Sequence, residues 1–505
     1  MSSTPATSTF PTSSLVPAAS TLVSASSMPS SSSSQTSSAA SPSGSIPATS
    51  NPKFIVAHHM VGNTYPYTKQ DWTDDITLAH ASGIDGFALN VGSDDWQKTQ
   101  VASAYEAAQD SGLPFKLFLS LDMTVLPCGS DADAQAIRSW VSQYTSHPNQ
   151  FIYGDRAFVS TFSGETCTFG AGSTAEGWHS QFVGHPDLAD KLFFVPSFFI
   201  DPATFPTFQD VMHGDFNWNG GWPIELTVDT LNNERTAAKV AADSAEDAIT
   251  KFIGSTDTDL KHIDGLASLR TAKTKRDGSS DKLAYMASVS PWFFTHYGAD
   301  SFNKNFVYLG DQHLYARRWE SLIAARDKVD IVEINTWNDY GESHYIGPIK
   351  GAQPNSEAWT DGMNHTAWLD LTKYYATAFK EGAFPSIDTD TIVMWARPHA
   401  VDAQAQNDPV GQPTNFKLFE DTVWAVVMAK SPATVTLRTS DSNSQTFDVP
   451  AGVSKLSIGI SAGETMYGSI ERDGKMITEL KPEGYALEGS PKTYNFNAFV
   501  ASASA

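Results

Sequence analysis

The sequence predicts an α/β fold, in which a (β/α)8 barrel is followed by a smaller C-terminal β-sandwich and preceded by a disordered Ser/Thr-rich segment. Three observations carry this prediction. Short apolar runs alternate with amphipathic helical stretches from Lys53 onward, β-rich runs without helical periodicity follow after residue 385, and the residues before Lys53 carry no charge. We therefore expect three parts, at residues 1–52, 53–385 and 386–505.

The segment 1–52 has too little apolar material to offset its chain entropy, so it is predicted to be disordered. More than half of its first fifty residues are Ser or Thr, a bias typical of O-glycosylated stalks on extracellular proteins. It lacks the basic and continuous apolar regions of a secretory signal. We expect an extracellular or cell-wall location, and a flexible tail on a cytoplasmic protein is the alternative.

Eight apolar runs with strand length are predicted to form the barrel sheet. They are residues 54–58, 84–91, 115–121, 157–162, 192–198, 211–216, 283–290 and 329–336. Such nearly continuous apolar runs are typical of parallel strands that are covered on both faces. An open doubly wound sheet is the alternative, but the count of eight favours a barrel, and no Gly-rich phosphate-binding motif follows the first run.

Helical spacing is clear between several of these runs. It is seen in Val101, Ala104, Tyr105 and Ala108, and again in Ile137, Trp140, Val141 and Tyr144. Gly112 and Pro114 are expected to end the first of these two helices.

The region after residue 385 reads as a β-sandwich. Its predicted strands are residues 391–395, 422–428, 434–437, 456–460, 466–470, 476–480 and 493–500. Asp473 and Gly474 predict a hairpin turn between two of them. Such a module either binds polysaccharide or braces the barrel, and we expect bracing.

The formal net charge of -23 argues against nucleic acid and anionic membranes as partners, because both would repel this chain. No apolar run approaches the roughly 20 residues of a membrane helix. The two cysteines, Cys128 and Cys167, form no zinc-like pattern and follow the third and fourth predicted strands. We expect a disulfide between them, no bound metal, and a monomer.

Polar and aromatic residues follow the predicted strands, and in a barrel they would gather at the rim where reactive groups lie. These candidates for substrate binding are His58, His59, Asn90, Asp94, Asp95, Trp96, Asp122, Trp218, Trp222, Trp292, Trp337 and His344. Carboxylates, amides and indoles together suit a sugar, whose hydroxyls accept and donate hydrogen bonds and whose C–H faces stack on rings. Each also has a structural alternative: a Trp can plug a loop, a His can lie in the core, and an Asp can cap a helix.

Asp339 and Glu342 follow the eighth predicted strand within the motif WNDYGE. Glycosidic cleavage requires such a pair, one carboxyl to protonate the leaving oxygen and one carboxylate to activate water or attack the anomeric carbon. In the alternative interpretation, Glu342 pairs with a basic residue and Asp339 caps a loop. By spacing alone, the pair indicates a glycoside hydrolase without specifying its substrate.

Several segments together resemble the fungal endo-1,3-α-glucanases, or mutanases, of glycoside hydrolase family 71. They are AHHMVGNT at 57–64, FALNVG at 87–92, SLDM at 120–123, VPSFF at 195–199 and NTWNDYGES at 335–343. The resemblance implies endo-acting, inverting hydrolysis of α-1,3-glucan without a cofactor. It maps the catalytic acids onto Asp339 and Glu342, for which we expect Glu342 as the acid and Asp339 as the base, roughly 6.5–9.5 Å apart. The alternatives are an adhesive glucan-binding module and a glycosidase for another α-linked glycan.

Overall fold

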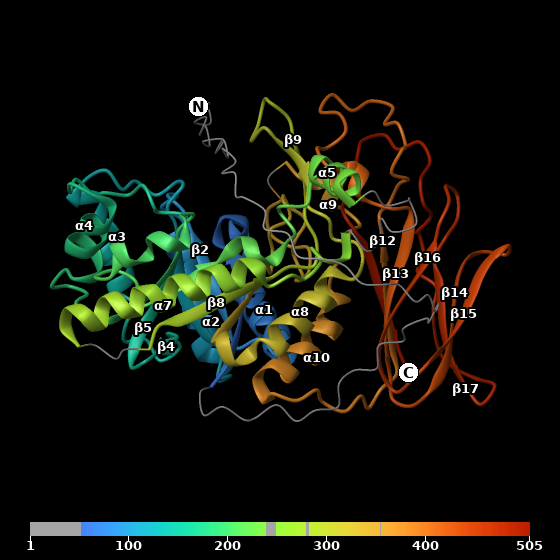
Figure 1. Ribbon diagram of the computed structural model, residues 1–505, viewed down its shortest axis with the longest axis horizontal. Coiled ribbons are helices and arrows are strands. Elements are labelled where there is room, and N and C mark those ends of the chain that lie inside the picture. The colour runs from blue at the N-terminus through green and yellow to red at the C-terminus, as the bar shows by residue number, and fades with distance from the viewer. Residues whose placement is uncertain (1–51, 239–248, 279–281, 354) are drawn as a thin grey trace, which may run out of the picture.

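The computed structural model describes residues 52–238, 249–278, 282–353 and 355–505. The predicted disordered segment lies outside them except for its last residue. Figure 1 shows two parts side by side, a mixed α/β body and the antiparallel sheets of the C-terminal region. Among the described helices, none combines the length and the apolar character that a membrane crossing requires.

All eight predicted strands of the body are confirmed, with small shifts at their ends. They are β1 (Phe54–Met60), β2 (Gly86–Val91), β3 (Lys116–Asp122), β5 (Arg156–Phe162), β6 (Leu192–Ser197), β7 (Gly214–Asn217), β8 (Ala284–Val289) and β11 (Ile331–Ile334). They pair in parallel in the order β6-β5-β3-β2-β1-β11-β8-β7, and the short β4 (Ile152–Tyr153) pairs antiparallel to β5. His213 N donates to Phe194 O at 2.8 Å, so the sheet curls until its two edges approach each other.

The inner face of this curled sheet has an apolar lower layer. Its buried side chains are Val56, Ala88, Phe118, Phe151, Phe158, Phe193, Val195, Phe216, Ala284, Met286 and Ile331. Because strand side chains alternate with a period of two, the next inward position along a strand lies nearer its carboxyl end. On six strands that position carries His58, Asn90, Ser120, Trp218, Ser288 or Glu333. A polar layer therefore lies above the apolar one, at the edge where reactive groups were expected.

Helices cover the outside of the body (Figure 1). They are α1 (Lys69–Ala81), α2 (Gln97–Ser111), α3 (Asp131–Ser142), α4 (Thr174–Trp178), α5 (Val228–Ala238), α7 (Asp257–Asp277), α8 (Leu314–Ala324), α9 (Glu357–Thr360) and α10 (Trp368–Glu381). The predicted apolar face of α2 is buried, and Gly112 ends the helix in the left-handed conformation with φ 64°. The predicted apolar face of α3 is also buried, although Tyr144 lies just beyond the helix end.

A hairpin that the sequence did not predict follows β8. It consists of β9 (Phe294–Tyr297) and β10 (Lys304–Val307), which pair antiparallel. Phe294 N donates to Glu342 O at 3.0 Å, so the hairpin is attached to the segment that carries the predicted catalytic pair.

Two four-stranded antiparallel sheets form the C-terminal region, in the orders β16-β13-β12-β19 and β15-β14-β17-β18. Their strands are β12 (Thr391–Ala396), β13 (Thr422–Ala429), β14 (Ala433–Ser440), β15 (Asn443–Val449), β16 (Gly452–Gly459), β17 (Tyr467–Arg472), β18 (Lys475–Leu480) and β19 (Phe499–Ser504). An apolar cluster lies between the sheets. Asp473 and Gly474 form the predicted turn, with φ 53° and 71°. The sequence did not predict the polar strand β15, and it placed the last strand, at 493–500, too early.

The body and the first C-terminal sheet share one apolar core. Trp292 of the body contacts Trp368, and its Nε1 donates to Phe496 O at 2.7 Å. Trp395 on β12 contacts Trp368 from the opposite side of the junction. All four side chains belong to the same buried cluster as the outer face of the curled sheet. The C-terminal sheets therefore pack closely against the body, as bracing requires.

The predicted disulfide is present. Cys128 and Cys167 are bonded, with their Cα atoms 5.2 Å apart, and they join the loops that follow β3 and β5. Since these loops lie at the carboxyl edge of the sheet, the disulfide holds part of the rim in place.

Candidate active site

The motif WNDYGE begins just beyond β11 and is fastened to β1. Asn338 Oδ1 accepts from Met60 N at 2.7 Å, and its Nδ2 donates to Met60 O at 3.1 Å. Trp337 N donates to His58 O at 2.7 Å. These bonds hold the start of the motif at the carboxyl edge of the sheet, with Asp339 next in the chain.

A tight turn brings the two carboxylates together. Asp339 N donates to Thr336 Oγ1 at 2.8 Å, and Glu342 N donates to Asp339 Oδ1 at 3.3 Å. Between them, a β-carbon at Gly341 would overlap the Tyr297 hydroxyl, so the close approach of the β9 strand requires glycine there.

Asp339, Glu342 and His344 form an acidic cluster whose nearest side-chain atoms lie within 4.8 Å of one another. His344 Nε2 lies 3.1 Å from Glu342 Oε2 and 3.6 Å from Asp339 Oδ2. Lys304 Nζ, from the β9–β10 hairpin, lies 2.9 Å from Glu342 Oε1. Side-chain exposures of 17% for Asp339 and 22% for Glu342 leave both reachable from solvent. The sequence contained no signal for Lys304, because the hairpin brings it from a distant position.

The two carboxyl groups have opposite pKa shifts. Burial raises the pKa of Asp339, and the charge of Glu342 adds to this effect. Burial acts in the same direction on Glu342, but the Lys304 ammonium and His344 outweigh it and hold its pKa well below its usual range. Asp339 is therefore the better proton donor and Glu342 the ionised partner. These directions favour the reverse of the expected assignment, in which Glu342 was the acid.

The separation of the pair also differs from the expectation. Carboxylate oxygens of Asp339 and Glu342 approach within 4.8 Å, whereas roughly 6.5–9.5 Å is typical of inverting enzymes. Lys304 and His344 each hold one oxygen of Glu342, which accounts for its place beside Asp339. The ion pair with Lys304 also agrees with the alternative interpretation that Glu342 pairs with a basic residue.

A buried His–Glu pair lies in the polar layer below the acidic cluster. His58 Nδ1 lies 2.6 Å from Glu333 Oε1, and both side chains are at most 1% exposed. Within the described part of the chain, neither His58 Nε2 nor Glu333 Oε2 meets a hydrogen-bond partner. Burial raises the pKa of Glu333, and the hydrogen bond from His58 opposes this shift. Sequence reasoning missed Glu333, although a lone carboxylate inside an apolar strand was a usable signal.

Trp218 is the best placed aromatic candidate. Its indole is only partly buried, and it contacts the His58 ring at 4.7 Å and the His344 ring at 6.4 Å. It thus connects the His–Glu pair to the acidic cluster. Asp122 also faces this region, where burial raises its pKa, and its Oδ1 accepts from Thr124 N at 3.1 Å. This bond agrees with the capping alternative for Asp122.

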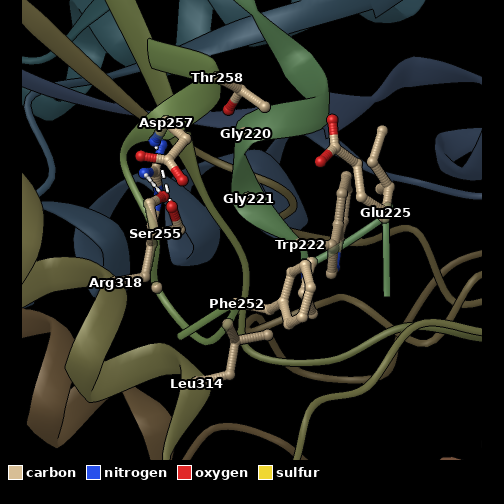
Figure 2. Close-up of a pocket in the computed structure, with 13 residues that line it drawn as sticks. Gly220, Gly221, Trp222, Glu225, Phe252, Ser255, Asp257, Thr258, Leu314 and Arg318 are labelled. Carbon is tan, nitrogen blue, oxygen red and sulfur yellow. Dashed lines mark hydrogen bonds between the residues drawn. The ribbon is translucent and has the colours of Figure 1, made fainter. Parts of the chain in front are cut away.

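Trp222 lies between the acidic cluster and a separate pocket. It contacts the His344 ring at 5.2 Å, and it lines the pocket of about 70 Å³ shown in Figure 2 together with Phe252, Leu314 and Arg318. Neither Asp339 nor Glu342 lines this pocket. At 5% exposure, Trp222 offers little open surface for a sugar.

Three predicted substrate contacts, His59, Trp292 and Trp337, have side chains that are buried away from the acidic cluster. His59 points outward from β1 to Asp75, at 3.2 Å, and has no exposed surface. Trp337 packs against Phe87 on the outer face of the sheet, and Trp292 lies in the junction core. This burial agrees with the structural alternatives, in which a Trp plugs a loop and a His lies in the core.

Asp94, Asp95 and Trp96 lie at the start of α2 rather than at the acidic cluster. Asp94 O accepts from Gln97 N at 3.0 Å, and the 95% exposed Asp95 pairs with Lys98. Trp96 makes an edge contact with the exposed Tyr65 at 5.3 Å. These residues form an outer part of the rim.

A family model and three known proteins match nearly the whole chain. The model of glycosyl hydrolase family 71 matches residues 51–505. The chain is 36% identical to the glucan endo-1,3-alpha-glucosidase agn1 of Schizosaccharomyces pombe, over 91% of this chain and 96% of that protein. It is 32% identical to a mutanase of Penicillium rubens (90% and 89%) and 28% identical to the ascus wall endo-1,3-alpha-glucanase of S. pombe (88% and 96%). A solved GH99 endo-alpha-mannosidase is 10% identical, with a TM-score of 0.43 over 65% of this chain and 98% of that one.

The family model covers both the body and the C-terminal sheets, and one relative is 36% identical over nearly the full length of both chains. Both findings agree with the paired carboxylates at the edge of the sheet. The chain belongs to glycosyl hydrolase family 71 and is a glycoside hydrolase.

Proposed function

We propose that this protein hydrolyses α-1,3-glucan internally, with Asp339 and Glu342 as its catalytic pair. The observation that carries the proposal is the placement of both carboxylates in one turn at the carboxyl edge of the sheet, and their opposite pKa shifts support it. The names of the family relatives, endo-1,3-alpha-glucanase and mutanase, support this substrate and mode of attack.

In the proposed reaction, protonated Asp339 donates its proton to the glycosidic oxygen while the bond from that oxygen to C1 breaks. Ionised Glu342 accepts a proton from a water that attacks C1 from the opposite face. The α-linkage thus yields a β-configured reducing end, and no cofactor is needed. For this geometry, the two carboxyl groups must stand roughly 6.5–9.5 Å apart with substrate and water bound, so Glu342 moves away from Asp339 when they enter.

The polar layer supplies the contacts that position the sugar. Trp218 offers a ring face for stacking, and the buried His58, held by Glu333, packs against the Trp218 ring and positions it. Asn90 lies at the end of β2, two positions beyond the inward-facing Ala88. Trp96 with Tyr65 would contact the glucan farther along the rim.

For the whole chain, we propose that residues 53–385 form a closed (β/α)8 barrel and residues 386–505 a bracing β-sandwich. The approach of β6 to β7 and the cluster between the two C-terminal sheets support these assignments. We propose an extracellular or cell-wall location for a monomeric enzyme, supported by the disulfide and by the ascus wall relative.

The direct test compares reducing-sugar release from α-1,3-glucan, α-1,4-glucan and β-1,3-glucan. Wild type should act on the first alone, and Asp339→Asn and Glu342→Gln should each lower turnover by about 10²–10⁴-fold while glucan binding persists. Near-normal turnover in either variant would remove that residue from the pair. Binding without release by wild type would instead support an adhesive module.

The stereochemical outcome is checked separately by proton NMR of the first-formed reducing end. Inversion gives the β-anomer before mutarotation. Initial formation of the α-anomer would show retention. Retaining enzymes have the shorter carboxyl separation, so this result would mean that the two carboxyl groups stay close together when substrate binds.

A further inference from the structure

The motif Asn364-His365-Thr366 is the single Asn-x-Ser/Thr acceptor sequence for N-linked glycosylation in the chain. It lies in the turn between α9 and α10, and Asn364 is exposed. Asn364 Oδ1 accepts from both Thr366 N and Thr366 Oγ1, each at 2.9 Å. These bonds use the carboxamide oxygen, so Nδ2, the atom that is glycosylated, takes no part in them.

His365, the middle residue of the motif, is buried and anchors the turn that carries Asn364 and Thr366. His365 is fully buried and stacks on Tyr345 at 4.0 Å. Its ring nitrogens lie 2.9 Å from the carbonyl oxygens of Tyr345 and Ala498. Because His365 is held inside, Asn364 stays on the surface, at the junction of the body with the C-terminal sheets.

A groove begins beside Asn364. Its lining includes Met363, the residue before Asn364, together with Tyr485, Leu487, Glu488 and Phe499, and its volume is about 500 Å³. Met363 and Phe499 are partly exposed in this lining and suit the C–H face and the acetyl methyl of an N-acetylated sugar, while the exposed Glu488 offers a carboxylate to its hydroxyls. The groove thus has the chemistry to receive a sugar attached at Asn364.

We propose that Asn364 carries an N-linked glycan whose first N-acetylglucosamine lies along this groove. The donor is a lipid-linked pyrophosphate oligosaccharide: the bond from Nδ2 to sugar C1 forms, the bond from C1 to the pyrophosphate oxygen breaks, and Nδ2 releases a proton. The modification does not depend on the catalytic assignment. It rests on the proposed extracellular location, which the Cys128–Cys167 bond reports independently.

Mass spectrometry of the full chain secreted from a fungal host tests occupancy. Peptide N-glycosidase F in heavy-oxygen water should convert Asn364 to labelled Asp in wild type and in Thr366→Ser, and not in Thr366→Ala. The oxidised Cys128–Cys167 peptide and glucan hydrolysis are measured on the same sample. An unmodified Asn364 in oxidised, active protein overturns the proposal and leaves the glucanase intact. Reduced cysteines without glycan would overturn the location as well.

Hydrogen exchange tests the position of the first sugar. Endoglycosidase H leaves one N-acetylglucosamine on Asn364, whereas peptide N-glycosidase F leaves none. Residues 484–489 should exchange more slowly in the first sample than in the second, and a distant segment such as β15 should be unchanged. Equal exchange of 484–489 in both samples would show that the sugar does not lie in the groove.

Discussion

Lys304 and His344 lower the pKa of Glu342, whereas burial raises that of Asp339, although the two acids lie in the same turn. Lys304 comes from a hairpin between β8 and α8, and its ammonium lies 2.9 Å from Glu342. Without Lys304 and His344 together, burial would raise the pKa of Glu342 as it raises that of Asp339. The division of roles therefore depends on a contact between residues distant in sequence.

Replacing this lysine should shift the pH dependence of catalysis. A folded-state pKa that is depressed keeps Glu342 ionised down to low pH, so the acidic limb of kcat/KM lies low in wild type. In Lys304→Met the pKa of Glu342 rises, and the acidic limb should move to higher pH. The measurement is kcat/KM against pH, with the exposed Lys98→Met as control. An unshifted limb would show that Lys304 does not set this pKa.

Trp218 and Trp292 both follow predicted strands, but their replacement should affect different properties, KM for the first and stability for the second. Trp218→Ala should raise KM with a small loss of stability, because its ring is partly exposed beside the acidic cluster. Trp292→Ala should lower the free energy of unfolding by about 3–5 kcal/mol with little change in KM, because Trp292 is buried in the junction. Kinetics and urea unfolding of both variants check this. A raised KM in folded Trp292→Ala would restore it as a substrate contact.

Among the elements, the loops after β3 and β5 are tied together by the disulfide. The bond closes a loop with a sequence separation of 39, for which chain-entropy estimates give about 4 kcal/mol. The double variant Cys128→Ser/Cys167→Ser should therefore unfold at a lower urea concentration, by up to this amount. Reduced wild type is the matched comparison. Unchanged unfolding midpoints would mean that the folded loops hold their positions without the bond.

Some secondary structure elements could be predicted from the sequence and others could not. The buried strands of the body are apolar for nearly their whole length, so each could be located from residue type alone. Strand β15 is polar and largely exposed, and the β9–β10 hairpin is short, so neither produced a pattern that stands out. The two-residue strand β4 was missed for the same reason as the hairpin.

At the scale of the whole molecule, the body and the C-terminal sheets share one buried apolar core. Besides the shared tryptophan cluster, His313 Nε2 lies 3.1 Å from Ala425 O and 3.0 Å from Leu456 O, across the junction. Removal of residues 386–505 would expose the buried side chains of this junction, including Trp292 and Trp368.

Full-length protein should accordingly unfold in a single calorimetric transition, and a chain ending at residue 385 should be insoluble or lack a cooperative transition. The physical reason is that one apolar core crosses the proposed domain boundary. Scanning calorimetry of both chains checks this. Two separate transitions, or a stable and active 52–385 chain, would contradict it.

The sequence by itself determined the parallel strands, the disulfide partners and the position of Asp339 and Glu342 beyond the eighth strand. Each follows from local features, namely apolar runs, a pair of cysteines and a motif, and each was found where expected. It also named Trp218 and His344, whose rings prove to be near each other at the acidic cluster.

Only the tertiary structure decided which rim candidates face the site and in which direction the pKa of each carboxyl is shifted. His58 faces inward and His59 outward because side chains alternate along β1, and only the curl of the sheet defines the inside. Lys304 and Glu333 approach their partners Glu342 and His58 from distant parts of the chain. Burial and nearby charge set a pKa, and both are properties of the folded molecule.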